Sequence, residues 1–116
     1  NLLFAKIGSQ LNRYSIMTTT SADKKYLRQL GHQLKPVVTV ARKGLNDNVL
    51  SEIDRALNDH ELIKIKLAIG DKTAKQEVII NLCQSCNAQL IQAIGHIALV
   101  YRKADKPDPK LSNLLR

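Results

Sequence analysis

The sequence predicts a single compact α/β domain with the element order α-β-α-β-α-β-β, in which a four-stranded mixed sheet is packed with helices. Its 116 residues, 44% hydrophobic and 24% charged, have the size and balance of one globular domain. Segments with helical spacing of apolar residues alternate with short β-branched or strictly alternating segments. The last two apolar segments are separated only by Gly95 and His96, which is typical of a hairpin.

Three segments have the pattern of amphipathic helices. The first covers about residues 21–34, because Ser21 can cap its first turn and Pro36 blocks its continuation. The second follows Asn46 or Asp47 as cap and ends near residues 58–59, and the third starts at the cap Asp71. Their expected apolar faces are Tyr26, Leu27, Leu30 and Leu34; Val49, Leu50, Ile53, Ala56 and Leu57; and Ala74, Val78, Ile79, Leu82, Cys83 and Cys86.

Four segments have the pattern of strands: residues 37–40, 62–68, 89–94 and 97–102. In the second of these, Lys64 and Lys66 alternate with apolar residues and so share one face of the sheet. That face is either a solvated surface or part of a phosphate-binding surface. The β-α-β steps predict right-handed parallel crossovers, and the last two strands predict an antiparallel pair.

The two ends of the chain differ in composition from the middle. Residues 1–16 contain no acid and no clear period, and Met17 looks like a natural start. We expect residues 1–20 to be a leader outside the fold, although the alternative of a short helix folding back onto the domain stays open. The domain itself is expected at residues 21–103. Prolines among charged residues after Lys103 predict a flexible tail at 104–116.

The charge balance favours a polyanionic partner. Lys and Arg total 18 against 10 acids, which gives a net charge of +8 and a pI near 9.7. Nucleic acid and an acidic membrane surface both fit this excess. The chain has three Tyr, one Phe and no Trp, which argues against an RNA reader built on stacked aromatics. Neither a membrane span nor a signal peptide is evident, so we expect a cytoplasmic protein.

The strongest local feature is the run Ala41-Arg42-Lys43-Gly44 between a strand and a capped helix. Gly44 can adopt positive φ and leaves space for another backbone to approach. Amides at a helix N-terminus attract phosphate, and Arg42 and Lys43 add charge at the same point. Spacing alone leaves two interpretations open: a phosphate-binding loop, or an ordinary strand-to-helix turn with solvated cations.

The cysteines and histidines give weaker signals. Cys83 and Cys86 have the spacing of a redox motif or of half a zinc site, but both fall late in a helix, where no N-terminus lowers a thiol pKa. A structural zinc site needs four ligands, and there is no second cysteine pair. We therefore expect buried, small apolar residues, no metal and no cofactor. His32, His60 and His96 are scattered and accompany no nucleophile motif.

Several separate segments resemble the CRM domain, an RNA-binding domain of chloroplast intron-splicing factors and small bacterial YhbY-like proteins. The matching segments, in family order, are residues 24–28 leading to 34–37, the loop 41–45, residues 60–66, and residues 94–97 leading to Tyr101 and Arg102. The resemblance covers roughly residues 21–103. This chain departs from the family pattern at Ala41, where the first loop glycine is usual.

The resemblance implies a fold like the C-terminal domain of bacterial translation initiation factor three. It also implies a bacterial protein, without catalysis, that binds precursor 23S ribosomal RNA or pre-50S particles and assists assembly of the large ribosomal subunit. We expect a monomer. The RNA-binding residues expected on both grounds are Ala41, Arg42, Lys43, Gly44, Lys24, Lys25, Arg28, Lys64 and Lys66. The alternatives are a general DNA- or nucleoid-binding protein and, in another class, a small thiol oxidoreductase using Cys83 and Cys86.

Overall fold

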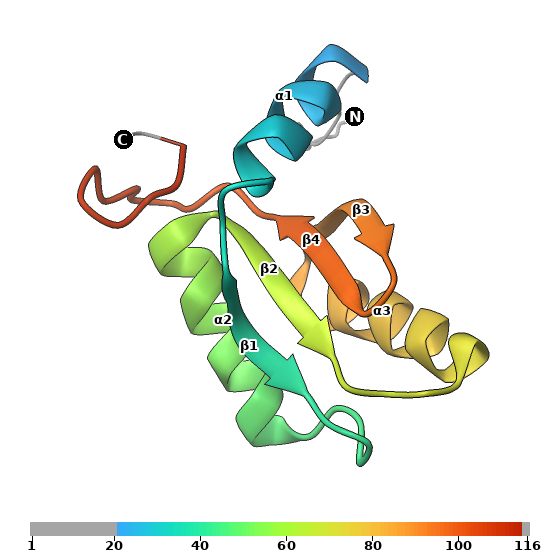
Figure 1. Cartoon of the computed structure of the whole chain (residues 1–116). Helices are drawn as coiled ribbons and strands as arrows, with labels where there is room; N and C mark the ends of the chain where they lie inside the picture. Colours follow the sequence, from blue (N-terminus) through green and yellow to red (C-terminus); the bar gives the residue numbers. More distant parts are fainter. Residues whose placement is uncertain (1–20, 115–116) are drawn as a thin grey trace, which may run out of the picture.

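A computed structural model describes residues 21–114 and confirms the predicted order of three helices and four strands (Figure 1). The elements are α1 (Ser21–Gly31), β1 (Pro36–Val40), α2 (Asp47–His60), β2 (Leu62–Leu67), α3 (Lys72–Cys86), β3 (Gln89–Ile94) and β4 (Ile97–Tyr101). The expected leader, residues 1–20, lies outside the described residues. Within the described part of the chain, no helix combines the length and the apolar character needed to cross a bilayer.

The sheet is mixed, as predicted, and its strand order is β1-β2-β4-β3. β1 pairs with β2 in parallel, and β4 is antiparallel to both β2 and β3. β4 therefore lies between β2 and β3, so the connection through α3 passes over one strand. This order makes β1 and β3 the two edges of the sheet.

The main core lies between one face of the sheet and the helices α2 and α3, which lie behind the sheet in Figure 1. The alternation predicted for β2 is correct: Ile63, Ile65 and Leu67 are almost fully buried against these helices. The apolar face predicted for α3 also lies in this core, with Ile79, Leu82 and Cys86 buried. Because side chains alternate along a strand, Lys64 and Lys66 emerge on the opposite face.

Among the residues that the structure describes, the opposite face of the sheet is covered at one end, mainly by α1 (Figure 1). Leu27 of α1 packs there against Leu62, Ile91 and Leu99 in a second, smaller apolar cluster. No other described element covers the remainder of this face. We call it the open face: Val37 and Thr39 of β1, Lys64 and Lys66 of β2, Gln92 and Ile94 of β3, and Ile97 of β4.

The prediction for the first helix needs two corrections. α1 ends at Gly31 instead of Leu34, and Tyr26 is 56% exposed, not part of the buried stripe. Gly31 is buried because α1 approaches the sheet closely there: a Cβ at this position would lie 2.6 Å from a methyl carbon of Leu99. A helix that covers only one end of a sheet buries a narrow stripe, and Tyr26 falls outside it.

The N-caps predicted for the second and third helices are confirmed, whereas Ser21, the cap predicted for the first helix, is itself the first residue of α1. The Oδ1 atom of Asn46 accepts a hydrogen bond from the Val49 N–H at 2.9 Å, and Oδ2 of Asp71 accepts one from the Ala74 N–H at 2.9 Å. The carboxyl ends of α2 and α3 are followed by Glu61 (φ 64°) and Asn87 (φ 58°). Positive φ at a glutamate is uncommon, which indicates that the surroundings of Glu61 hold it in place.

The segment after Lys103, for which the sequence predicts a flexible tail, is packed against the domain in the structure. Ala104 and Ser112 are buried. The N–H of Asn113 donates to the carbonyl of His60 at 3.0 Å, and its side-chain amide donates to the carbonyl of Leu62 at 2.6 Å. The composition of the segment could not predict these contacts, because the residues that it contacts lie about 50 positions away in the chain.

Candidate nucleic-acid interface

The loop Ala41–Gly44 joins β1 to α2 at the edge where both parallel strands end (Figure 1). The N–H of Gly44 donates to the carbonyl of Ala41 at 2.8 Å, which closes a tight turn. Arg42 and Lys43, between them, are exposed. Gly44 has φ 80°, as the sequence analysis expected, and no atom outside its immediate neighbours lies within 4 Å of the point that a Cβ would occupy. The turn thus presents two cations and an accessible backbone.

Lys64 and Lys66 lie on the open face, with Lys66 near the loop end of β1 and Lys64 opposite Pro36 at the start of that strand. Lys66 is opposite Thr39, two residues before Ala41, so its side chain and the loop belong to one continuous surface. Lys66 is exposed and Lys64 is half-buried. No ion pair joins Lys64, Lys66, Arg42 or Lys43 to an acid among residues 21–114. These four cations are therefore available to an external anion.

The three cations predicted on the first helix belong to α1, at the end of the sheet away from the loop. Lys25 is exposed, while Lys24 and Arg28 are half-buried. Figure 1 places α1 at the end of the sheet away from the loop 41–44. The structure thus places the predicted site residues in the loop Ala41–Gly44, on the open face (Lys64 and Lys66), and on α1 at the end of the sheet away from the loop.

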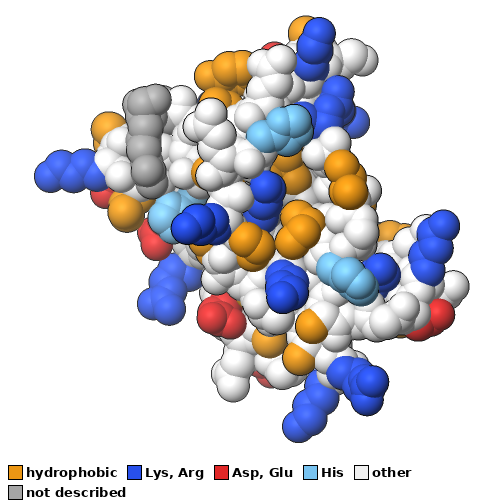
Figure 2. Space-filling model, viewed as in Figure 1, with side chains coloured by type: hydrophobic (Ala, Val, Ile, Leu, Met, Phe, Trp, Pro, Cys, Tyr) orange, Lys and Arg blue, Asp and Glu red, His pale blue; other side chains and the backbone are white. Residues whose placement is uncertain are grey.

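Figure 2 shows how charge is distributed over this face. Lys and Arg side chains are spread from α1, over the sheet, to the loop between β1 and α2, whereas Asp and Glu are few and lie toward the margins. A face of this kind attracts polyanions over its whole length. It is also broad enough to contact several phosphates at once.

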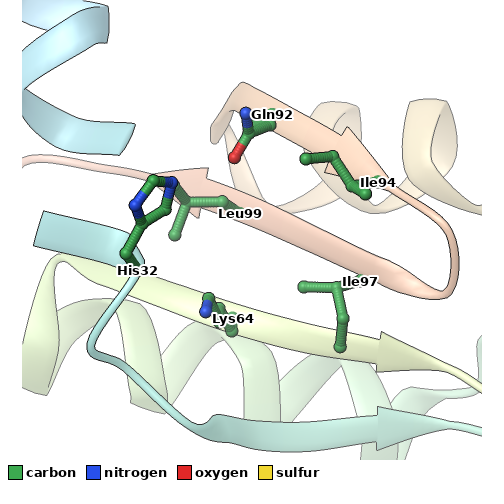
Figure 3. A pocket seen from close by; sticks show the side chains of 6 residues that line it. All are labelled: His32, Lys64, Gln92, Ile94, Ile97 and Leu99. Atoms are coloured by element: carbon green, nitrogen blue, oxygen red, sulfur yellow. The ribbon is translucent and has the colours of Figure 1, made fainter. Parts of the chain in front are cut away.

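The open face also carries a shallow hollow that the sequence analysis missed (Figure 3). Its volume is about 220 Å³. The residues that line it are His32, Lys64, Gln92, Ile94, Ile97 and Leu99. The sequence signal for this hollow was the alternation of side chains along β3 and β4. It places Gln92 and Ile94 on one face of β3, and Ile97 and Leu99 on one face of β4. Only the strand order, with β4 beside β2, brings these pairs next to Lys64.

The cysteines occupy the positions that the sequence predicts for apolar residues. Cys86 is buried, Cys83 is half-buried, and both are free thiols. Burial raises the pKa of Cys83, and the neighbouring Cys86 adds to the rise. Burial also raises the pKa of Cys86, although the Arg102 guanidinium acts in the opposite direction. A thiol oxidoreductase needs a lowered thiol pKa, so this geometry does not favour that alternative.

Two of the three histidines contact backbone carbonyls of distant residues. A ring nitrogen of His60 lies 2.8 Å from the carbonyl of Leu111, and one of His96 lies 3.1 Å from the carbonyl of Leu67. His32 follows α1 and lines the hollow. Across residues 21–114, no three His, Cys, Asp or Glu side chains converge in a way that could hold a metal ion.

Two acids in or just after α2, Asp54 and Glu61, have structural roles. Glu61 is only 3% exposed, and its carboxylate accepts hydrogen bonds from the Ala104 N–H and the Ser112 hydroxyl, both at 2.8 Å. Asp54 pairs with Arg102 at 2.7 Å. The Arg102 guanidinium also donates to the carbonyls of Cys86 and Asp54 and to the side chain of Asn58. Arg102 thereby links the end of β4 to both core helices.

The fold and this face define a class: a small α/β domain with an exposed, basic sheet face beside a glycine-containing loop. Within that class, the family model for the CRS1/YhbY (CRM) domain matches residues 20–102. The chain therefore belongs to this family, and the resemblance found in the sequence is confirmed.

Named relatives and a solved structure are also similar to this chain. It is 48% identical over 100 residues to a protein of Pseudomonas aeruginosa named a probable RNA-binding protein, covering 86% of this chain and 96% of that protein. It is 44% identical over 91 residues to an RNA-binding protein of Haemophilus influenzae, covering 78% and 92% of the two chains. A Staphylococcus aureus protein, described with its solution structure as a candidate RNA-binding protein, superposes with a TM-score of 0.68 at 30% identity, covering 77% and 93%.

Proposed function

We propose that this protein binds RNA through the open face and the loop Ala41–Gly44. The observation that carries the proposal is the continuity between Lys66 and that loop: Lys66 lies opposite Thr39 in the strand that leads directly into Ala41. Two cations of the sheet and two of the loop thus share one surface without intramolecular ion pairs among the described residues. The names of the relatives support RNA as the polyanion.

We further propose that the RNA is precursor 23S ribosomal RNA, free or in pre-50S particles, and that the protein assists assembly of the large subunit as a cytoplasmic, non-catalytic monomer. Family membership supports this setting. The net charge of +8 supports binding to a large polyanion under cellular salt conditions. Phosphate contacts position a protein without reading sequence, so specificity must come from the shape of the RNA or from base contacts.

Crosslinking in bacterial cells, followed by sequencing of the bound RNA, tests the cellular target. We expect crosslinks concentrated in precursor 23S RNA and a fraction of the protein that sediments with pre-50S particles. The matched control is the variant Arg42→Ala/Lys43→Ala, which should lose most of these crosslinks at equal abundance. Crosslinks spread over DNA or over unrelated RNAs, for the parent protein, would contradict the ribosomal assignment.

A further inference from the structure

Two rows of side chains cross the open face from strand to strand. In the first row, Lys64 of β2 is opposite Leu99 of β4, and Leu99 is opposite Gln92 of β3. The second row lies two residues further along. There Lys66 is opposite Ile97, and Ile97 is opposite Ile94. Each row thus has a cation on β2 and an apolar side chain on β4.

The hollow lies over these rows (Figure 3). Leu99, Ile97 and Ile94 give it an apolar floor, while Lys64 and Gln92 lie at its sides, with His32 beside Leu99. Its volume of about 220 Å³ admits one planar group the size of a nucleobase. None of the described residues that line it carries a carboxylate.

The chemistry of this lining matches an unpaired base and its flanking phosphates. The faces of a base are apolar and its edges carry hydrogen-bond donors and acceptors. The Gln92 amide offers both a donor and an acceptor to such an edge. Lys64 and Lys66 offer positive charge on the side where the sugar–phosphate chain would run. A base inside a duplex is stacked and paired, so only single-stranded RNA could present one here.

The side chain of Ile94 is left largely in contact with solvent. Ile94 is 63% exposed, the largest exposed fraction among the large apolar side chains of the described residues. It lies on a face that is otherwise rich in cations (Figure 2). A basic rim around an apolar floor complements an RNA base and its phosphates better than it complements an apolar protein surface. Against such a protein surface, the cations would lose their hydrating water without gaining an anion.

We propose that this hollow binds one unpaired nucleobase of the RNA, with Ile94, Ile97 and Leu99 against the base and Gln92 at its edge. This inference rests on the proposed RNA binding. It assigns to the open face a contact with bases, whereas the loop Ala41–Gly44 contacts phosphates. The domain would therefore prefer structured RNA that contains single-stranded segments.

The test combines protein variants with RNA variants. The RNA probes are a hairpin with a single-stranded loop, the same hairpin with abasic sites throughout its loop, and a fully paired duplex of equal length. The protein variants are Ile94→Ala and Gln92→Ala. Ile80→Ala is the matched control, because Ile80 is 55% exposed on α3, away from the open face.

We expect the parent protein and Ile80→Ala to bind the intact hairpin about fivefold to tenfold more tightly than the abasic hairpin, the effect of burying part of one base. In Ile94→Ala this preference should fall to no more than about twofold, and Gln92→Ala should reduce it as well. Affinity for the duplex should be equal in all four proteins. The abasic hairpin keeps its phosphates, so the preference isolates the base contact.

Three outcomes would overturn this inference in distinguishable ways. A parent protein that binds none of the RNAs contradicts the proposed function itself. A parent that binds RNA but keeps the same preference for the intact hairpin in Ile94→Ala contradicts only the base hollow. A parent that sediments as a dimer, with Ile94→Ala monomeric and its base preference unchanged, assigns the hollow to a second copy of the chain instead.

Discussion

The hydroxyl of Ser112 donates a hydrogen bond to Oε1 of Glu61 at 2.8 Å, and both residues are buried although 51 positions separate them in the chain. The other carboxylate oxygen accepts from the Ala104 N–H. Glu61 follows α2 and immediately precedes β2, so this contact ties the C-terminal segment to the point where the central strand begins. Residues 60–66, one of the segments that resemble the family pattern, thus include a buried anchoring residue, Glu61.

Replacing Ser112 with Ala should lower the free energy of unfolding by about 1–3 kcal/mol, because it leaves a buried carboxylate oxygen without its hydroxyl donor. Urea unfolding at neutral pH measures the change. Ser85→Ala is the control, since Ser85 is exposed on α3. Equal stability of the two variants would indicate that the segment 104–114 is mobile in solution, as its composition suggests.

Arg102→Lys should destabilise the domain by about 1–3 kcal/mol without changing RNA binding, because Lys cannot reproduce the planar fork of the guanidinium. Through that fork Arg102 donates to Asp54, Asn58 and the carbonyl of Cys86. Thermal unfolding and an RNA titration at several salt concentrations check the two parts. A weaker salt dependence in the folded variant would instead identify Arg102 as a phosphate contact.

The buried thiols predict a loss of stability at alkaline pH. Burial raises the pKa of Cys83 and Cys86, so the unfolded chain releases these protons at lower pH than the native domain does. Their contribution is therefore complete below the unfolded thiol pKa of about 8.5 and decreases above it. We expect the stability of the parent to fall more steeply above this pH than that of Cys83→Ala/Cys86→Ala, which should bind RNA normally. If the stability of the parent and of the double variant fell in parallel with pH, the thiols would not be responsible for the loss. A double variant that folds but no longer binds RNA would refute the claim that the cysteines are dispensable for binding.

Gly44→Val should weaken RNA binding several-fold while leaving the salt dependence unchanged. The substitution removes no charge, but Val strains a backbone with φ 80° and fills the open space beside the turn. The comparison requires a variant whose circular dichroism and melting temperature show that it is folded. An unaltered affinity in such a variant would show that close backbone approach at this turn is not needed.

Local patterns predicted the elements well because each depends on neighbouring residues. Asn46 and Asp71 cap helices through contacts three residues away, and the alternation around Lys64 and Lys66 follows from strand geometry alone. The turn at Gly44 was predictable for the same reason. These features located the loop and one pair of cations in the candidate interface.

The features that the sequence analysis missed depend on contacts between distant segments. The anchoring of residues 104–114 needs Glu61, and the end of α1 at Gly31 reflects its closeness to Leu99. The hollow needs β4 to lie between β2 and β3, which the order of the elements does not specify. Tyr26 was misplaced because helical spacing does not show how much of a helix a sheet will cover.

The most direct test of the central claim is the salt dependence of RNA binding in Arg42→Ala/Lys43→Ala. If the open face and its loop neutralise about four to six phosphates, the slope of log affinity against log salt should be about −3 to −5 for the parent. In the double variant the magnitude of this slope should be smaller by about one to two, and affinity should fall by similar factors for related RNAs. Arg55→Ala/Lys106→Ala removes two exposed cations away from the loop and should keep the slope of the parent. Equal slopes for the parent and a folded Arg42→Ala/Lys43→Ala variant would contradict the claim that RNA is bound at this loop.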